Sequence, residues 1–167
     1  MQYQTALRNL TGRPLQKIGR AADLLWLQFG ELHEVSSNRG MRTVGDWAVH
    51  VQTSWRFVQD AKIIVAVGDL YMLPDGSNYD WDAGGISSFD SLAKEMNRLF
   101  AAGTTEVLNV VSDDVGGFSI KFSGDIRFDL FTNTSDSIID IEHWRIFQPT
   151  TDDAHLVRYS GDNRNNT

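Results

Sequence analysis

Apolar and polar residues alternate most regularly along residues 47–57. Five of the six odd-numbered positions are large and apolar, which predicts a β-strand with one face in the core. The opposite face carries His50, Gln52 and Arg56, whose side chains would stand about 7 Å apart along the strand. This polar face is the first candidate for a binding surface, although a solvent-exposed sheet face has the same pattern.

Shorter apolar stretches separated by turn residues predict further strands, about eight or nine in all. The predicted strand ranges are 15–22, 24–29, 47–57, 62–67, 106–112, 118–122, 126–131, 138–147 and 155–159. Because most neighbouring strands are joined by short turns, we expect largely antiparallel pairing. Residues 31–45 and 68–85 show no sustained period and are predicted to be loops. Loops as long as the second are usually functional or mobile.

A helical period is clearest at about residues 88–102, where apolar residues recur on one face. Ser87 or Ser88 can cap its first turn, and Gly103 suits its C-terminal end. We expect the apolar stripe of this helix to pack on the apolar face of the strand at 47–57. A shorter helix is expected at residues 2–10, ended by the glycine and proline that follow.

These elements predict an α+β fold. We expect a single domain at residues 1–160, dominated by a curved, largely antiparallel β-sheet of about eight or nine strands with one amphipathic helix packed on it. Residues 161–167 contain no apolar side chain and are predicted to form a disordered polar tail.

The amino-acid composition mainly excludes certain classes of site and a membrane-spanning segment. The 167 residues include no cysteine, which excludes disulfide scaffolds, iron–sulfur clusters and cysteine nucleophiles. No apolar run approaches the about 18 residues of a membrane span, and the first residues lack the pattern of a signal peptide. We therefore expect a cytoplasmic protein that does not insert into membranes.

The net charge of −7 is unevenly distributed along the chain. Residues 63–167 carry 17 acidic and 7 basic side chains, whereas residues 1–62 carry 5 and 8. An acidic surface repels phosphate backbones and attracts basic proteins. We therefore expect no nucleic-acid partner and consider a basic protein partner possible.

A second group of polar residues, Glu142, His143 and Arg145, lies in the predicted strand at 138–147. This strand has apolar residues on both faces, so its charged side chains need partners, and a structural ion-pair network is the favoured interpretation. An alternative is an acid–base pair between His50 and either Glu142 or His143, because imidazole titrates near neutral pH and a carboxylate can orient it.

Other chemistry has little support in the sequence, and neither a metal nor a cofactor is expected. The four histidines lie far apart in the chain, without the spacing of a local zinc site. Asn78, Asp80 and Asp82 alternate as calcium ligands do, but the glycine and glutamate of that loop motif are missing. No nucleophile elbow, P-loop or dinucleotide fingerprint is present.

One resemblance to known proteins rests on residues spread over most of the chain. In order, they are Trp47, His50, Gln52, Trp55, Arg56, Gly116, Gly117, Glu142, His143, Trp144, Arg145, Phe147 and Pro149. In this order they resemble small bacterial proteins of unknown function, some of which are suspected immunity proteins of contact-dependent or polymorphic toxin systems. The resemblance covers about residues 15–159 and implies a noncatalytic role, without catalytic residues to transfer.

The leading hypothesis is a noncatalytic binding or immunity-type protein whose acidic surface recognises a basic protein partner. The alternative is a small-molecule binding protein or enzyme that uses His50, Gln52 and Arg56, with the loop at 68–85 as a lid. An enclosed pocket around these three side chains would favour the alternative, and an open face would favour the first hypothesis. A homodimer formed through an exposed sheet edge is a third possibility.

Overall fold

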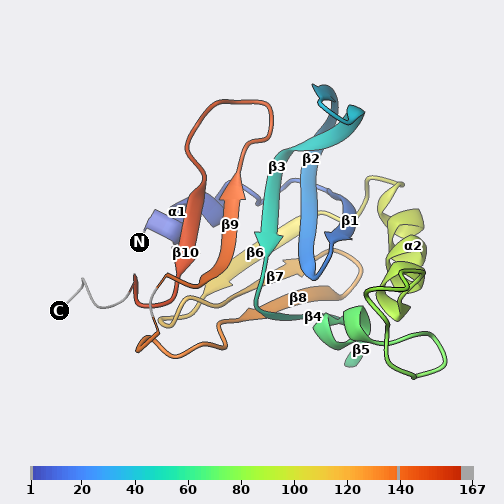
Figure 1. Ribbon diagram of the computed structural model, residues 1–167. Helices are drawn as coiled ribbons and strands as arrows, with labels where there is room; N and C mark the ends of the chain where they lie inside the picture. The colour runs from blue at the N-terminus through green and yellow to red at the C-terminus, as the bar shows by residue number, and fades with distance from the viewer. Residues whose placement is uncertain (1, 139, 163–167) are drawn as a thin grey trace.

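The computed structural model describes residues 2–138 and 140–162, which form an α+β fold with two antiparallel five-stranded sheets (Figure 1). The first sheet has the order β1-β2-β3-β9-β10, with bounds Leu15–Ala21, Leu24–Ser37, Gly40–Val51, Glu142–Phe147 and Leu156–Tyr159. The second has the order β5-β4-β8-β7-β6, with bounds Lys62–Ala66, Ser54–Gln59, Ile126–Phe131, Phe118–Phe122 and Val107–Ser112.

The prediction of one sheet with eight or nine strands is therefore wrong, because ten strands are divided between two layers. The chain passes from the first sheet to the second after β3 and returns before β9. In Figure 1 the first sheet stands in front, and β6, β7 and β8 run obliquely behind it. The core lies between the two layers.

The strand predicted at 47–57 is in fact two strands in different sheets. Gln52 and Thr53 join β3 to β4, and the backbone N–H of Gln52 donates to the carbonyl of His143. The Thr53 hydroxyl donates to the carbonyl of Phe131, 2.7 Å away. The alternation nevertheless continues through the junction, since Val51, Thr53 and Trp55 are all buried. A strand that changes sheets at a corner keeps its inner face inward, so the pattern conceals the change.

Residues 31–45, predicted to be a loop, instead form the outer half of a long β2–β3 hairpin. Neither β1 nor β9 pairs with this half, so it extends beyond its neighbours as a two-stranded ribbon (top of Figure 1). Most of its residues are exposed or half-buried. Because the ribbon has few buried side chains, it lacks the apolar period on which the prediction depended.

Aromatic side chains join the two sheets across the core. The rings of Phe29 and Phe122 stack with centroids 6.5 Å apart, and those of Phe118 and Trp144 meet edge to face at 5.0 Å. Each pair takes one ring from each sheet. Such pairs add about 0.5–1.5 kcal/mol beyond the burial of their area. The core thus includes an interface between the two sheets, and the helix at Ser88–Phe100 adds Phe89, Ala93, Met96 and Phe100 to it.

The described helices are α1 (Gln2–Arg8), the 3-10 helix η1 (Val67–Tyr71) and α2 (Ser88–Phe100). As predicted, Ser87 caps α2, and it shares a capping box with Asp90. The expected packing of α2 on the strand at 47–57 is only partly correct. Phe89 meets Trp55 at 5.8 Å between ring centroids, but α2 lies mainly beside the edge strand β1 (Figure 1).

The side chain of Asn97 covers the outer edge of β1. Its amide donates to the carbonyl of Ile18 and accepts from the Ile18 N–H, at 2.9 and 2.8 Å. This pair of bonds replaces the contacts that a further strand would make, which is one way to protect a sheet edge.

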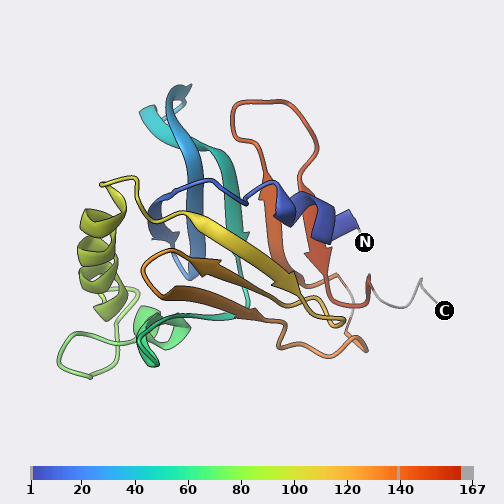
Figure 2. The ribbon, with the colours of Figure 1, turned by 180° about the vertical axis from the view of Figure 1, so that it is seen from behind.

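The two ends of the described chain lie on the same side of the molecule (Figure 2). Of the predicted strand at 138–147, residue 139 lies outside the described residues and β9 begins at Glu142. Residues 163–167 of the predicted tail also lie outside them, whereas the N–H of Gly161 donates to Asp136. Among the described helices, none has the length and apolar content to cross a membrane.

Candidate functional site

The structure separates the three polar residues that were predicted to share a strand face. His50 lies in β3 on the outer face of the first sheet, and Arg56 lies in β4 on the outer face of the second. Gln52 is exposed in the connection between them. The predicted surface of His50, Gln52 and Arg56 therefore does not exist as one site.

His50 belongs to a row of paired positions that crosses all five strands of the first sheet. The registered positions are Gly19, Trp26, His50, Arg145 and Val157. Burial, with the nearby Arg145 guanidinium, lowers the pKa of His50 from 6.5 to about 4. The imidazole is therefore neutral at pH 7, and a base this weak is poorly matched to proton transfer near neutral pH.

The ion pair predicted in the second polar group forms between Glu142 and Arg145. The pairing of β9 with β10 skips His143, and this irregularity brings Glu142 to the same side as Arg145, contrary to the simple alternation. Nε of Arg145 donates to one oxygen of Glu142 at 2.6 Å, and Nη2 donates to the other. Both carboxylate oxygens are thus held by Arg145 rather than by His50.

His143 does not belong to this ion pair. It is 2% exposed, and burial followed by the nearby Arg158 charge lowers its pKa. Its backbone carbonyl accepts the N–H of Gln52, so the residue helps to hold the junction between the sheets. Among the described residues, neither Glu142 nor His143 hydrogen-bonds to the His50 imidazole, so the acid–base alternative lacks its predicted contact.

Arg56 is held by a buried carboxylate in the second sheet. Asp129 accepts from Arg56 Nε at 3.0 Å, from two nitrogens of Arg127 and from the Ser119 hydroxyl. Burial alone would raise the pKa of Asp129, but the bonds from Arg127, Ser119 and Arg56 outweigh it and lower the pKa. The Arg56 guanidinium also lies over the Phe131 ring at 5.2 Å. These contacts explain Arg56 as part of a structural ion-pair network.

A different surface has the features of a binding site: the acidic aromatic segment, defined as residues 67–87 between β5 and α2. It begins with η1 and continues through a turn in which Leu73 and Ser77 are joined by a backbone hydrogen bond. Asp75 accepts from the N–H and hydroxyl of Ser77, and Asp80 accepts from the N–H of Asp82. The segment is thus locally ordered by its own side chains.

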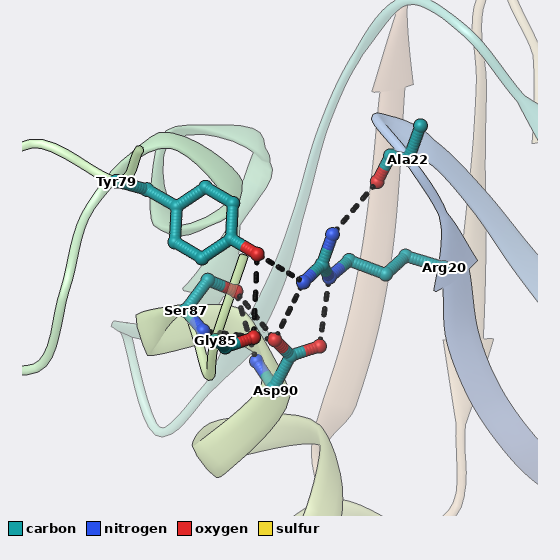
Figure 3. Close-up of polar contacts among 6 residues, drawn as sticks. All are labelled: Arg20, Ala22, Tyr79, Gly85, Ser87 and Asp90. Atoms are coloured by element: carbon teal, nitrogen blue, oxygen red, sulfur yellow. Dashed lines mark hydrogen bonds and ion pairs between the residues drawn. The ribbon is translucent and has the colours of Figure 1, made fainter. Parts of the chain in front are cut away.

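Arg20 of β1 ties this segment to the rest of the fold (Figure 3). Its Nε and Nη2 each donate to a carboxylate oxygen of Asp90 at 2.7 Å. Nη2 also lies 3.3 Å from the Tyr79 hydroxyl, which donates to the carbonyl of Gly85. Asp90 accepts from the N–H of Ser87 as well, so one carboxylate joins β1, the end of the segment and the start of α2.

Four large apolar side chains of the acidic aromatic segment remain exposed. They are Tyr71, Met72, Trp81 and Ile86, with exposed fractions of 41% to 65%. The Trp81 ring contacts those of Tyr71 and Tyr79 edge to face, and the Arg20 guanidinium lies 5.5 Å from its centroid. An anchored aromatic ring that stays exposed is typical of protein-binding surfaces.

The acidic aromatic segment also carries several aspartates. The segment contains Asp69, Asp75, Asp80 and Asp82 and no basic residue. Within residues 2–138 and 140–162, none of the four takes part in a salt bridge. The segment therefore combines exposed apolar side chains with aspartate charges that no salt bridge among the described residues neutralises.

Sequence reasoning identified this segment by its length but did not recognise its aromatic anchor. The density of aromatic residues was visible, since three of the 18 aromatic side chains lie within the eleven residues 71–81. The Arg20–Asp90 contact was not visible, because 70 residues separate the two partners.

Comparisons of the chain with protein-family models, with curated proteins and with solved structures each find no match.

Proposed function

We propose that the protein is a noncatalytic binding protein, of the immunity type, whose acidic aromatic segment recognises a basic protein partner. The observation that carries the proposal is the exposed Trp81 ring, which lies against the Arg20 guanidinium in a segment whose four aspartates have no salt-bridge partner among the described residues. Tryptophan and tyrosine are enriched among residues that dominate binding energy, and acidic residues around them select for basic partners.

The fixed position of the segment also supports tight binding. A loop that is already ordered loses less conformational entropy when a partner binds. The contacts of Arg20 with Asp90 and Tyr79 provide this order from outside the segment, while Asp75 and Asp80 provide it from within. Negative charge around the ring would also raise the association rate with a basic protein, more strongly at low salt.

The alternative, an enzyme or small-molecule binding protein using the His50 face, has less support. His50 and Arg56 stand on the outer faces of different sheets. Arg145 beside His50 pairs with Glu142, and Arg56 itself pairs with Asp129. Catalysis needs the reacting groups within hydrogen-bonding reach of one substrate, and this arrangement does not bring them together.

The test is copurification from the native host at low salt, followed by measurement of the affinity for any stoichiometric basic partner. We expect Trp81→Ala to weaken binding at least about tenfold through loss of the aromatic anchor. A variant with Asp75→Asn, Asp80→Asn and Asp82→Asn should slow association and reduce its salt dependence, since asparagine keeps the acceptor oxygens used in the turns.

Matched controls are Val111→Ala, which removes an exposed apolar side chain of the second sheet, and the pair Asp152→Asn and Asp153→Asn in the β9–β10 loop. Neither should change the affinity. Recovery of the protein alone at low salt, or a partner that binds the Trp81→Ala variant as tightly as the native protein, would contradict the proposal.

A further inference from the structure

A cavity of about 770 Å³ lies at the side of the molecule where the two ends of the described chain meet. The start of α1, the β6–β7 turn, β9 and the end of β10 enclose it. Its lining includes Tyr3, Asp113, Gly116, Trp144, Arg158 and Asp162. The cavity shares no lining residue with the acidic aromatic segment or with the row that contains His50.

Arg158 lines this cavity and is only 5% exposed. Its Nε–H is buried and has no hydrogen-bond partner among the described residues. The nearest carboxylate oxygen in a salt bridge belongs to Asp162, at 3.7 Å from Nη1, and the Tyr3 ring lies 5.4 Å from the guanidinium carbon. A buried charge is costly unless it is paired and hydrogen-bonded, and the Nε–H of this arginine lacks the acceptor that its burial calls for.

The β6–β7 turn lies directly against the Arg158 guanidinium. Gly116 has a φ of +98°, and a Cβ at this position would lie 2.4 Å from Arg158 Nε. The carbonyl of Gly116 accepts the indole N–H of Trp144 at 2.8 Å, which fixes the β6–β7 turn against β9. The turn therefore leaves space for the guanidinium and holds its own position by a separate bond.

The charges around the cavity restrict what it can bind. Arg158 provides one positive charge, while Asp113, Asp114 and Asp162 provide three negative ones. Asp113 already accepts from the N–H groups of Val115 and Gly117, and Asp162 accepts from the Tyr3 hydroxyl and the N–H of Tyr159. These bonds are made within the protein and supply no acceptor to Arg158 Nε.

A simple anion would pair with Arg158 but would meet three carboxylates, and a simple cation would leave the Arg158 Nε–H without an acceptor. A molecule with both charges satisfies both sides. We propose that the cavity binds a small zwitterion of the α-amino-acid class, with its carboxylate on the Arg158 guanidinium and its ammonium group toward the aspartate side. Arginine suits the first role because its planar fork matches a carboxylate.

The first test uses the native protein and the twenty common α-amino acids at millimolar concentration. Acetate and methylammonium, alone and together at equal ionic strength, are the single-charge controls. We expect at least one amino acid to raise the melting temperature in a saturable manner, as a ligand of the folded state must. The same amino acid should shift the Arg158 Nε–H resonance in the ¹⁵N NMR spectrum, and the controls should not.

A pair of glycine variants tests whether binding depends on Arg158. Gly116→Ala places a methyl group against Nε, whereas Gly40→Ala introduces alanine at a similar φ of +104° with no atom within 4 Å. The backbone penalty is thus matched and only the contact with Arg158 differs. We expect Gly116→Ala to weaken amino-acid binding at least about tenfold and Gly40→Ala to leave it unchanged.

If Gly116→Ala does not fold, Arg158→Lys provides the second variant, because lysine keeps the charge but lacks Nε and the fork. It should also weaken binding, with Arg98→Lys on the exposed face of α2 as its control. The proposal fails if no amino acid binds saturably, if acetate binds equally well, or if binding leaves the Arg158 resonance unmoved. It also fails if the folded Gly116→Ala or Arg158→Lys variant retains the native affinity.

Discussion

The contact between Arg20 and Asp90 makes a strong quantitative prediction. Two charge-assisted bonds of 2.7 Å join the side chains, which are 15% and 29% exposed. Exposed ion pairs contribute about 0.2–1 kcal/mol, and breaking a buried pair by removing one partner costs about 3–5 kcal/mol. This pair lies between these limits and nearer the buried one, so Arg20→Met should lower the free energy of unfolding by about 2–3 kcal/mol.

Urea denaturation at pH 7 measures this change, and Arg98→Met is the matched control. The Arg98–Glu95 pair in α2 has a similar bond of 2.7 Å, but its side chains are 63% and 66% exposed, so its loss should cost below about 0.5 kcal/mol. A double-mutant cycle with Arg20→Met and Asp90→Asn should give a coupling of about 1–3 kcal/mol. Equal costs for Arg20→Met and Arg98→Met, or no coupling, would refute the reasoning.

The pH dependence of the same pair has a defined sign. The hydrogen bonds from Arg20 lower the pKa of Asp90 below its ordinary value of 3.8. A carboxyl group with a lowered pKa in the folded state stabilises the fold above the unfolded pKa, and this contribution is lost as the pH falls through the folded pKa. The difference between native protein and Arg20→Met should thus be constant at neutral pH and decrease only below about pH 3.8.

Three further changes test other parts of the structure. Ala61→Gly should raise stability by about 0.5–1 kcal/mol, because alanine has a φ of +61° in the β4–β5 turn, and a lower melting temperature would contradict this. Asn97→Ala should cost about 2 kcal/mol by removing both bonds to Ile18 and should promote association through the uncovered β1 edge in light scattering, whereas Asn97→Asp keeps the acceptor for the Ile18 N–H. His50 should remain neutral in NMR titrations until the pH falls to about 4. Because its pKa in the folded state is lowered from 6.5, its titration should reduce the free energy of unfolding by at most roughly 3 kcal/mol between pH 6.5 and pH 4. His50→Gln should lessen this pH dependence.

Local signals explain why part of the fold was predictable. The strands at 118–122 and 126–131 were predicted with the observed bounds, since Gly124 and Asp125 mark the turn between them. The start of α2 was also correct because its capping residue, Ser87, acts within one turn. These features depend on residues that are close in the sequence, so the sequence pattern predicts them.

The division into two sheets depends on pairing between distant residues. Val51 pairs with Trp144, and Ser54 pairs with Phe131, so only two residues separate positions that belong to different layers. Since both layers turn the same side of the chain toward the core, alternation cannot distinguish one long strand from two. The prediction of one site around His50 and Arg56 was wrong for the same reason. Both residues have even numbers, which places them on one face of a single strand, but they lie in different sheets.

The two surfaces that the structure brings forward share a physical basis. In a two-layered fold each sheet has an outer face in water, and polar residues such as His50 need no function to be there. A cluster of exposed apolar side chains in an ordered segment, or a buried charged side chain with an N–H that lacks an acceptor, has no such explanation. Trp81 belongs to the first kind and Arg158 to the second. Folding alone favours apolar side chains in the core and charged side chains on the surface, and both residues depart from this. Such departures are better markers of a binding site than polar residues along one face of a strand.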